Sequence, residues 1–235
     1  MRSYKEIQGI LLERITSGVW PPGERVPDEA DLALEFGCTR PTVNRAMRGL
    51  AEAGLVERRR KAGTRVVQRV SRDAVVEIPV VRHEIERRGG RYRYLALGRR
   101  LAQPPATIRA VLDLAERRRA LHVRGLHLAD GRPWQLEDRW INLQTVPAAR
   151  QERFDTVSPN EWLLSRIPYS QAEHVFSAAM PDGDTRELLA LAGDEPVFVI
   201  ERTTWLAGRT VTHARLMHPG NGFRLTTRDP RPTVG

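Results

Sequence analysis

The sequence predicts an α+β protein of two domains, and three observations support this class. Helical apolar periodicity dominates the first 70 residues, which end in a hairpin pattern. Strand patterns separated by tight-turn signals dominate the remainder, with a few short helical segments between them. A length of 235 residues with 40% hydrophobic content is enough for two ordinary domains. We expect an N-terminal domain over residues 1–70, a linker at 71–74 and a C-terminal domain with antiparallel strands over 75–235.

The N-terminal domain begins with a predicted helix over residues 4–17. A second, short helix is predicted between Pro27 and Gly37. A third follows, with Thr39 as an N-cap whose hydroxyl is expected to accept from a first-turn amide, and with Gly54 beyond its end. The apolar face of this third helix recurs at i, i+3, i+4 and i+7 and consists of Val43, Ala46, Met47 and Leu50.

The opposite face of the third helix is polar and basic. It holds Pro41, Asn44, Arg45 and Arg48. A helix in a DNA groove needs this division, because one side packs on its own domain while the other presents donors to bases and phosphates. A solvated basic face is the alternative for an isolated helix. The context favours the first interpretation, since a hairpin with a basic tip over residues 58–64 follows, suited to a phosphate backbone or a minor groove. We therefore interpret residues 26–67 as a winged helix-turn-helix with one helix in the major groove.

Charge and cysteine content agree with this interpretation. The net charge is +9, and the first 72 residues hold 14 Lys or Arg against 9 Asp or Glu. A basic N-terminal domain fits a polyanionic partner, although an arginine-rich composition would also raise the count. The single cysteine, Cys38, cannot form an internal disulfide or a thiolate metal site and is expected to be a small buried side chain. No apolar run is long enough to span a membrane and no signal peptide is recognisable, so a cytoplasmic location is expected.

The N-terminal domain contains four motifs at fixed spacing: P-x-E-x-x-L-A-x-x-F-G from Pro27, T-R-x-T-V-x-R-A from Thr39, E-x-G-L-V-E-R-R and G-T. Together they resemble the DNA-binding domain of GntR-type bacterial regulators. The resemblance implies that Arg40, Thr42 and Arg45 contact an operator and that the wing around Gly63 assists. Ala30 stands where the family usually has an operator-contacting arginine, and Lys61 replaces the first glycine of the wing tip. The polar helix face, the basic hairpin and the resemblance together predict the DNA-binding residues. They are Thr39, Arg40, Pro41, Thr42, Asn44, Arg45, Arg48, Lys61, Gly63 and Thr64.

The C-terminal domain is predicted to alternate helices and strands. Helices are expected through residues 81–88, 105–117, 158 onward and 182–191. Strands are expected at 92–101, 121–128, 134–141, 169–180, 197–206 and 210–218. Asp130-Gly131 is a strong two-residue hairpin signal, and Ala207-Gly208 marks a second hairpin.

Standard catalytic and cofactor signatures are absent from the sequence. There is no G-x-S-x-G, no dinucleotide fingerprint, no P-loop and no H-E-x-x-H. The six histidines are scattered, so no metal site and no cofactor are expected. The alternative to a DNA-binding protein is an enzyme, a lyase or hydrolase that uses a pocket in the second domain. The sequence shows no set of acid and base groups positioned for such catalysis.

Charged side chains occur unusually often within the predicted strands. They are Arg124, His127, Glu137, Arg139, Glu173, His174, Arg202 and Arg215. For any one of them an outward, solvated orientation is the simpler interpretation. For the group, a polar pocket is favoured because several fall on strands expected in the middle of the sheet.

Four segments of the C-terminal domain are distinctive: Leu136 to Asn142, Ser158 to Asn160, Ala172 to His174 and Ala214 to Gly220. They resemble the effector-binding UTRA domain of the HutC branch of the same family. More narrowly, they are similar to the histidine-utilisation repressors of that branch. The resemblance implies a chorismate-lyase-like fold, a role as repressor of histidine-utilisation genes and a small anionic effector, urocanate. A bidentate cation would hold its carboxylate, and a carboxylate or histidine its ring nitrogens. The candidate effector residues are Arg124 or Arg215 for the first role, and Glu137, His127, His174 or Tyr169 for the second.

Three partners are implied by the resemblance. These are a double-stranded DNA operator with a short inverted repeat, a second copy of the chain in a symmetric homodimer, and the effector. Effector binding would release the DNA by favouring a dimer with the wrong separation of reading helices. A response to a different small anion and sequence-independent DNA binding remain as alternatives.

Overall fold

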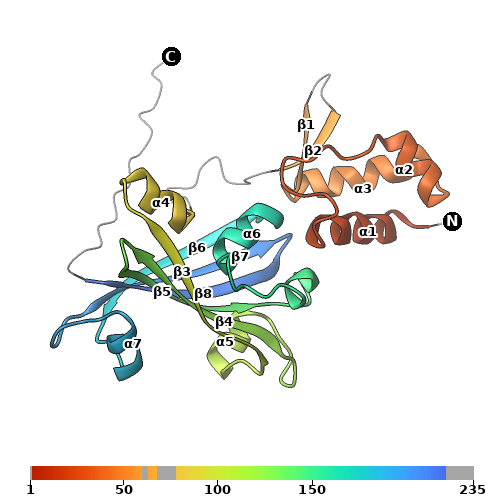
Figure 1. Ribbon diagram of the computed structural model, residues 1–235. Helices are drawn as coiled ribbons and strands as arrows, with labels where there is room; N and C mark the ends of the chain where they lie inside the picture. Colours follow the sequence, from red (N-terminus) through yellow and green to blue (C-terminus); the bar gives the residue numbers. More distant parts are fainter. Residues whose placement is uncertain (1, 60–62, 68–77, 221–235) are drawn as a thin grey trace, which may run out of the picture.

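The computed structural model describes residues 2–59, 63–67 and 78–220 (Figure 1). Its N-terminal part contains three helices and a two-stranded sheet. They are α1 (Tyr4–Thr16), α2 (Glu29–Phe36), α3 (Arg40–Glu52), β1 (Val56–Arg59) and β2 (Gly63–Val66). This is the predicted winged helix-turn-helix, with the helices in the predicted order.

The three helices share one apolar core. From α1, Ile7, Leu11 and Ile15 are fully buried, and they join the predicted apolar face of α3. Gly37 ends α2 in the left-handed conformation, with φ of 61°, which turns the chain within two residues into α3. Cys38, expected to be buried, is half-buried against this core.

The β1–β2 hairpin is attached to the helical core by backbone hydrogen bonds. Its register pairs Val56 with Val66, and the amides of Gly23 and Val26 donate to the carbonyls of Val66 and Thr64. Lys61, at the tip, lies outside the described residues, as does the expected linker at 71–74.

Residues 78–220 form a six-stranded antiparallel sheet with helices on both faces, in the order β3-β4-β5-β8-β7-β6, which confirms the predicted α+β class. Its strands are β3 (Tyr92–Ala102), β4 (Ala120–Ala129), β5 (Arg132–Ile141), β6 (Gln171–Ala179), β7 (Val197–Leu206) and β8 (Arg209–Pro219). Its helices are α4 (Val81–Arg87), α5 (Ala106–Val111), η1 (Pro147–Arg150), α6 (Pro159–Arg166) and α7 (Gly183–Leu188). Both predicted hairpin turns have two consecutive residues of positive φ: Asp130 and Gly131, and Ala207 and Gly208.

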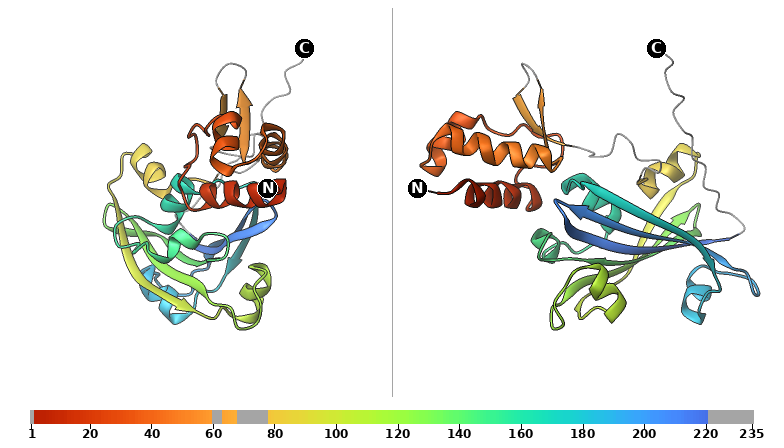
Figure 2. Two further views of the ribbon diagram at one scale, coloured as in Figure 1. Left: turned by 90° about the vertical axis from the view of Figure 1, so that its right-hand side faces the viewer. Right: turned by 180° about the vertical axis from the view of Figure 1, so that it is seen from behind.

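Helices cover the sheet from two sides. In Figures 1 and 2, α4 and α6 lie over one face, here the α6 face, while α5 and α7 lie over the other, here the α5–α7 face. Because successive strand residues point to opposite faces, Glu137 and Arg139 lie on the α6 face and Asp138 lies on the α5–α7 face.

Two predicted helices are shorter than expected. The helix expected over 105–117 ends at Val111, because Asp113 adopts a φ of 51° and turns the chain so that Leu112 and Leu114 are buried with Trp140. The helix expected over 182–191 ends at Leu188. In both cases tertiary packing, which periodicity does not record, decides where the helix stops.

No helix among the described residues is long and apolar enough to cross a membrane.

Candidate DNA-binding surface and effector site

The third helix presents the predicted polar residues to the outside. Arg40, Pro41, Arg45 and Arg48 are exposed, whereas Thr42 and Asn44 are half-buried. With Glu29 of α2, five of these six residues line a concave surface: Arg40, Pro41, Asn44, Arg45 and Arg48. A concave, arginine-rich helix face is suited to the edge of a DNA groove.

Glu29 organises the donors on this surface. Its carboxylate accepts from Asn44 Nδ2 at 3.0 Å and from the Arg58 guanidinium of β1 at 2.8 Å, and Arg40 Nε lies 3.9 Å away. The same Asn44 side chain accepts from Arg48 through Oδ1 at 3.5 Å. Glu29 therefore links the reading helix to the wing and holds their side chains in a defined arrangement without DNA.

Two further contacts fix the beginning and middle of the helix. The Arg45 guanidinium lies 4.0 Å from the Tyr4 ring centroid, a cation–π contact that still leaves Arg45 exposed. Thr39 is the N-cap residue, but its side chain makes no capping hydrogen bond. The expected bond to a first-turn amide is wrong, because the Thr39 hydroxyl pairs instead with the Thr42 hydroxyl at 2.8 Å.

The described part of the wing is held by Arg25 and Arg65. Gly63 has a φ of 76°, and a Cβ there would lie 3.1 Å from Arg25 Nε, so a glycine fits both the backbone and the neighbouring guanidinium. Arg65 donates to the Gly23 carbonyl at 2.9 Å. Ala30, where the family usually has an arginine, is exposed on α2 and supplies no donor side chain.

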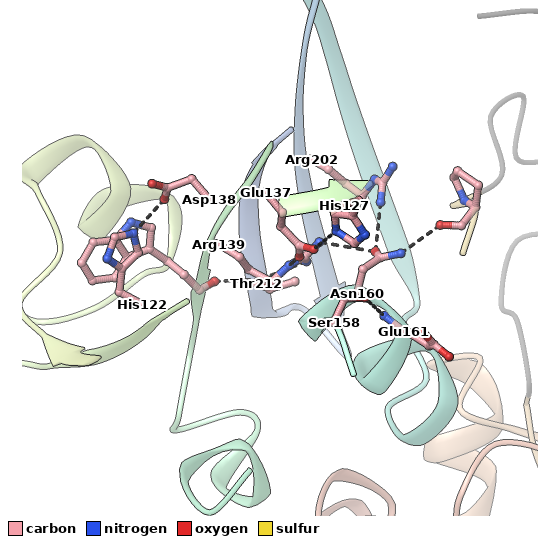
Figure 3. Close-up of polar contacts among 12 residues, drawn as sticks. His122, His127, Glu137, Asp138, Arg139, Ser158, Asn160, Glu161, Arg202 and Thr212 are labelled. Carbon is pink, nitrogen blue, oxygen red and sulfur yellow. Dashed lines mark hydrogen bonds and ion pairs between the residues drawn. The ribbon is translucent and has the colours of Figure 1, made fainter. Parts of the chain in front are cut away.

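The α6 face contains a buried polar cluster centred on Glu137 (Figure 3). Both carboxylate oxygens are occupied: Oε1 accepts from Arg139 Nε, and Oε2 pairs with His127 Nε2 at 3.0 Å. His127 Nδ1 in turn lies 2.9 Å from the Tyr92 hydroxyl. Burial raises the pKa of Glu137, but the Arg139 charge and the His127 hydrogen bond outweigh burial and lower that pKa to about 2. Glu137 is thus ionised and fixes both neighbours.

A second buried arginine, Arg202 of β7, lies beside this cluster. It donates to His174 Nε2 at 3.0 Å and to Asn160 Oδ1 at 3.2 Å, and the same Asn160 oxygen accepts from Arg139 at 3.3 Å. Among the described residues, Arg202 makes no ion pair with a carboxylate. Burial, then repulsion from Arg139, lowers the pKa of Arg202 to about 9, so the side chain stays cationic at neutral pH.

Within the described part of the chain, the cluster therefore contains two buried guanidinium groups and one buried carboxylate. A buried charge without a counter-charge is energetically unfavourable, so this arrangement favours an incoming anion. The Tyr94 hydroxyl, buried on the same face over Gly125, also lacks a hydrogen-bond partner among the described residues. Burial raises the pKa of Tyr94, which leaves a neutral donor.

His174 extends the cluster to the edge strand β6. Burial, and then the neighbouring Arg202 charge, lower its pKa to about 4, so at neutral pH the ring is uncharged and accepts from Arg202. Tyr169, just before β6, is half-buried and acts electrostatically on Arg202.

Asn160 connects this cluster to the chain that enters the domain. Its Oδ1 accepts from both buried arginines, and its Nδ2 donates to the Pro79 carbonyl at 2.9 Å. Ser158 caps α6 by accepting from the Glu161 amide, which fixes Asn160 in the first helical turn. Glu161 also binds Arg82 of α4 at 3.2 Å, so α4 and α6 are joined beside the cluster.

The six predicted effector residues do not form one site. His127, Glu137 and His174 belong to the buried cluster, with Tyr169 near it. Arg124 and Arg215 lie on the opposite, α5–α7 face, and so they cannot supply the cation beside Glu137. Arg139 and Arg202 supply it instead. Both belong to the charged residues of the predicted strands, and the two-residue strand period places Arg139 on the face of Glu137. Asn160 and Tyr94 were not predicted.

Comparisons with known proteins agree with this architecture. The family model for the UTRA domain matches residues 87–224, and that for the bacterial regulatory proteins of the gntR family matches residues 3–66. A histidine utilization repressor from Pseudomonas aeruginosa is 34% identical over 96% of this chain and 90% of its own length. Another, from Klebsiella aerogenes, is 32% identical over 96% of this chain and 93% of its own length.

Solved structures show the same fold. The C-terminal domain of a histidine utilization repressor from Pseudomonas syringae pv. tomato matches with a TM-score of 0.56 and 30% identity, covering 60% of this chain and all of that one. PhnF from Mycobacterium smegmatis matches with a TM-score of 0.60 and 21% identity over 95% of this chain and 99% of its own.

A winged helix-turn-helix with a basic reading face, joined to an α+β domain with a buried anion-favouring cluster, defines a DNA-binding transcription regulator. The chain belongs to the GntR family of bacterial regulatory proteins, and its C-terminal part is a UTRA domain of the HutC branch. It is a regulator and not an enzyme.

Proposed function

We propose that this chain represses histidine-utilisation genes and leaves its operator when a small anion, urocanate, enters the cluster around Arg202. The observation that carries the effector proposal is a buried guanidinium with no carboxylate partner among the described residues. The relatives named histidine utilization repressors, which match along nearly the whole chain, support the choice of genes.

The DNA side of the proposal follows from the surface around Glu29. The chain acts in the bacterial cytoplasm as a symmetric homodimer, and each copy places α3 in a major groove of an inverted repeat. Thr39, Arg40, Pro41, Thr42, Asn44, Arg45 and Arg48 form the reading surface, with Lys61, Gly63 and Thr64 on the wing. The exposed arginines contribute phosphate and base contacts, so binding weakens as salt increases.

The effector side follows from the chemistry of the cluster. A carboxylate accepts two hydrogen bonds from a guanidinium, and Arg202 is the buried guanidinium that lacks this partner. An imidazole ring needs a hydrogen-bonding neighbour, and the Tyr94 hydroxyl and the His127–Glu137 pair lie on the same face. Glu137 is fully committed to Arg139 and His127, so it meets the ligand ring directly only if one of these neighbours moves.

The test is a fluorescence-anisotropy titration of the full-length protein on the DNA upstream of its own gene, at one stated salt concentration, with and without urocanate. We expect specific binding that urocanate reverses. The amide of urocanate, which keeps the ring but not the charge, should leave the complex intact, because Arg202 then has no anion to bind.

The matched variants are Arg202→Gln and Arg153→Gln. Arg153 carries the same side chain, but its side chain is 85% exposed. Arg202→Gln should require about tenfold more urocanate or worse, since one charge-assisted pair is lost, and Arg153→Gln should behave like the wild type. Specific DNA binding that does not change with urocanate would contradict the effector assignment but not the repressor assignment. The absence of specific DNA binding would contradict the repressor assignment as well.

A further inference from the structure

A separate cavity of about 640 Å³ lies on the α5–α7 face, on the opposite side of the sheet from the Glu137 cluster. Residues of β3, β4, β5, β8 and β7 line it on the sheet side, and the rest of its lining comes from α5, from α7 and from the residues just before these two helices. In Figure 1 these two helices stand on the same side of the sheet, below the strands. Its volume is in the range of small-molecule sites, which is about 300–1,000 Å³.

Four charged side chains cross the sheet in one row of this cavity. The strand register pairs Arg124 with Asp138, Asp138 with Arg215 and Arg215 with Glu201. Positive and negative side chains therefore alternate across β4, β5, β8 and β7. Each charge has an opposite neighbour, so the row has no net charge.

An aromatic row lies beside the charged row, two residues along each strand and thus about 7 Å away. The register pairs His122 with Trp140 and Trp140 with His213. The His122 and Trp140 rings are stacked at 4.2 Å and 14°. His122 Nδ1 accepts from Arg100 at 3.2 Å, so its Nε2 donates to Asp138 at 2.8 Å, and these two bonds hold the ring plane.

Two members of the charged row are available to a ligand. Arg215 and Glu201 are separated by 3.8 Å, too far for a good hydrogen bond, and their side chains are 47% and 41% exposed. Asp138, by contrast, already accepts from His122 and lies 3.4 Å from Arg124. Asp182, at the start of α7, accepts from the Thr185 amide. A ligand would therefore bind between Arg215 and Glu201.

The charge balance of the lining indicates the kind of ligand. Among the lining residues that the structure describes, three arginines (Arg100, Arg124 and Arg215) face three carboxylates (Asp138, Asp182 and Glu201). A net anion, such as the effector proposed for the other face, would have no excess positive charge to bind here. A zwitterion would satisfy Arg215 and Glu201 at once, and a flat ring would lie against the small part of the aromatic row that faces the cavity, where His122 and Trp140 are each 7% exposed.

We propose that this cavity binds an aromatic or heteroaromatic α-amino acid, with its carboxylate on Arg215, its ammonium on Glu201 and its ring over Trp140 and His122. This site does not depend on the proposed function of the Glu137 cluster. One protein would then have an anion site and an amino-acid site on opposite faces of a single sheet.

The test is isothermal titration calorimetry of the full-length protein with L-histidine, L-phenylalanine and L-tryptophan in turn, each as a separate probe. We expect at least one of them to bind in the micromolar to low millimolar range. Glycine, which has the zwitterion but no ring, and the matching decarboxylated amine, such as histamine for histidine, should bind about tenfold more weakly or not at all, since each lacks one half of the contacts.

The matched variants are Glu201→Gln, Arg215→Gln and, as a control, Glu187→Gln on the exposed surface of α7. The first two should weaken amino-acid binding about tenfold, because each removes one charge-assisted contact. Glu187→Gln should bind the amino acid as the wild type does. All three variants should respond to urocanate as the wild type does. Circular dichroism checks that each variant is folded. If no probe binds at 10 mM to the wild type, or if folded Glu201→Gln and Arg215→Gln bind as the wild type does, the proposal is overturned.

Discussion

Arg202 combines an unfavourable position for stability with a favourable one for binding. It is buried beside another guanidinium, and its described partners, His174 and Asn160, are neutral. Replacement of a whole buried ion pair by apolar side chains of similar volume is often neutral or stabilising by about 1–4 kcal/mol, and removal of Arg202 would leave no carboxylate partner unpaired among the described residues. We therefore expect Arg202→Met to be at least as stable as the wild type in urea denaturation, yet insensitive to urocanate.

The control for this prediction is Arg139→Met. Arg139 is paired with Glu137, so its removal leaves a buried carboxylate without its partner and should destabilise the fold by about 3–5 kcal/mol. Equal losses of stability in both variants would show that Arg202 is compensated as well as Arg139 is.

Arg45 is the residue on which the DNA-reading assignment depends most directly. It is exposed at the centre of α3 and is held in place by the Tyr4 ring. Arg45→Ala should weaken operator binding by about 1–3 kcal/mol and reduce the salt dependence by about one phosphate contact. Anisotropy titrations at several salt concentrations measure both effects. Arg153→Ala, with the same charge change on the other domain, should change neither, and urocanate affinity should be the same in both variants.

Part of the buried cluster around Glu137 can be predicted from the sequence, and the residues that the structure places elsewhere have a physical reason. Residue chemistry and resemblance predict Glu137, His127 and His174, and these three lie together in the structure. Arg124 and Arg215 are predicted as cations from residue chemistry, which does not indicate the face of the sheet on which a side chain lies. A strand alternates its side chains with a period of two, so Arg124 lies on the opposite face of β4 from His127, three residues away, and the sequence alone could have excluded it. The face of Arg215, on another strand, can be assigned only when the register is known, and register is a tertiary property.

At the scale of elements, the sequence predicts nearly every helix and strand but not the helix ends in the second domain. The winged domain was the more predictable, because its turns are marked by local residues such as Gly37. The ends of α5 and α7 depend on what their neighbours bury, as Leu112 and Leu114 illustrate. The strand order, with β8 between β5 and β7, also follows from packing and is not specified by local patterns.

One glycine of β4 makes room for a side chain of β3. A Cβ at Gly125 would collide with the Tyr94 side chain, which crosses over it on the α6 face. Gly125→Ala should therefore displace Tyr94 and cost about 1–3 kcal/mol of folding free energy. Gly98→Ala on β3 is the matched control, since its Cβ would meet nothing within 4 Å. Thermal unfolding of the two variants measures the difference, and a Gly125→Ala variant as stable as Gly98→Ala would contradict the packing described.

At the scale of the whole molecule, buried ionisable groups predict that stability decreases in acid. Burial lowers the pKa of His218 to about 3 and also lowers that of His213, and His174 is lowered to about 4. As pH falls below 6.5, these histidines become protonated in the unfolded chain but stay neutral in the folded chain. The free energy of unfolding therefore declines. Below pH 4.5 the lowered pKa of Glu137 acts in the same direction, because the folded state keeps this carboxylate ionised.

Urea denaturation at pH 7, 6 and 5 tests this expectation. His218 alone should contribute a loss of about 2 kcal/mol by pH 5, the value for a group that is protonated only when unfolded. The variant His218→Gln should show a smaller decline over the same interval. A constant or rising stability between pH 7 and pH 5 would contradict the assignment of neutral, buried imidazoles.

Communication between the two domains is expected to pass through Asn160. Asn160→Asp keeps an oxygen for Arg139 and Arg202, but it loses the Nδ2 donor to Pro79 and places a carboxylate beside Arg202. We expect this variant to bind the operator several-fold more weakly without effector and to respond less to urocanate. Gln151→Glu, the same amide-to-acid change on an exposed side chain, is the control, and anisotropy is the measurement. Wild-type operator affinity and response in Asn160→Asp would exclude this route.

The two ends of the Asn160 amide also imply a limit on how the protein senses its environment. If the amide couples the effector cluster to the chain beyond Pro79, the operator must oppose the effector by the same factor by which the effector opposes the operator. Repressor on DNA is then a less sensitive detector than repressor free in solution. The effector concentration at which genes are induced would exceed the dissociation constant of the effector for the DNA-free protein. In cells with more operator copies per repressor, induction would require a higher effector concentration.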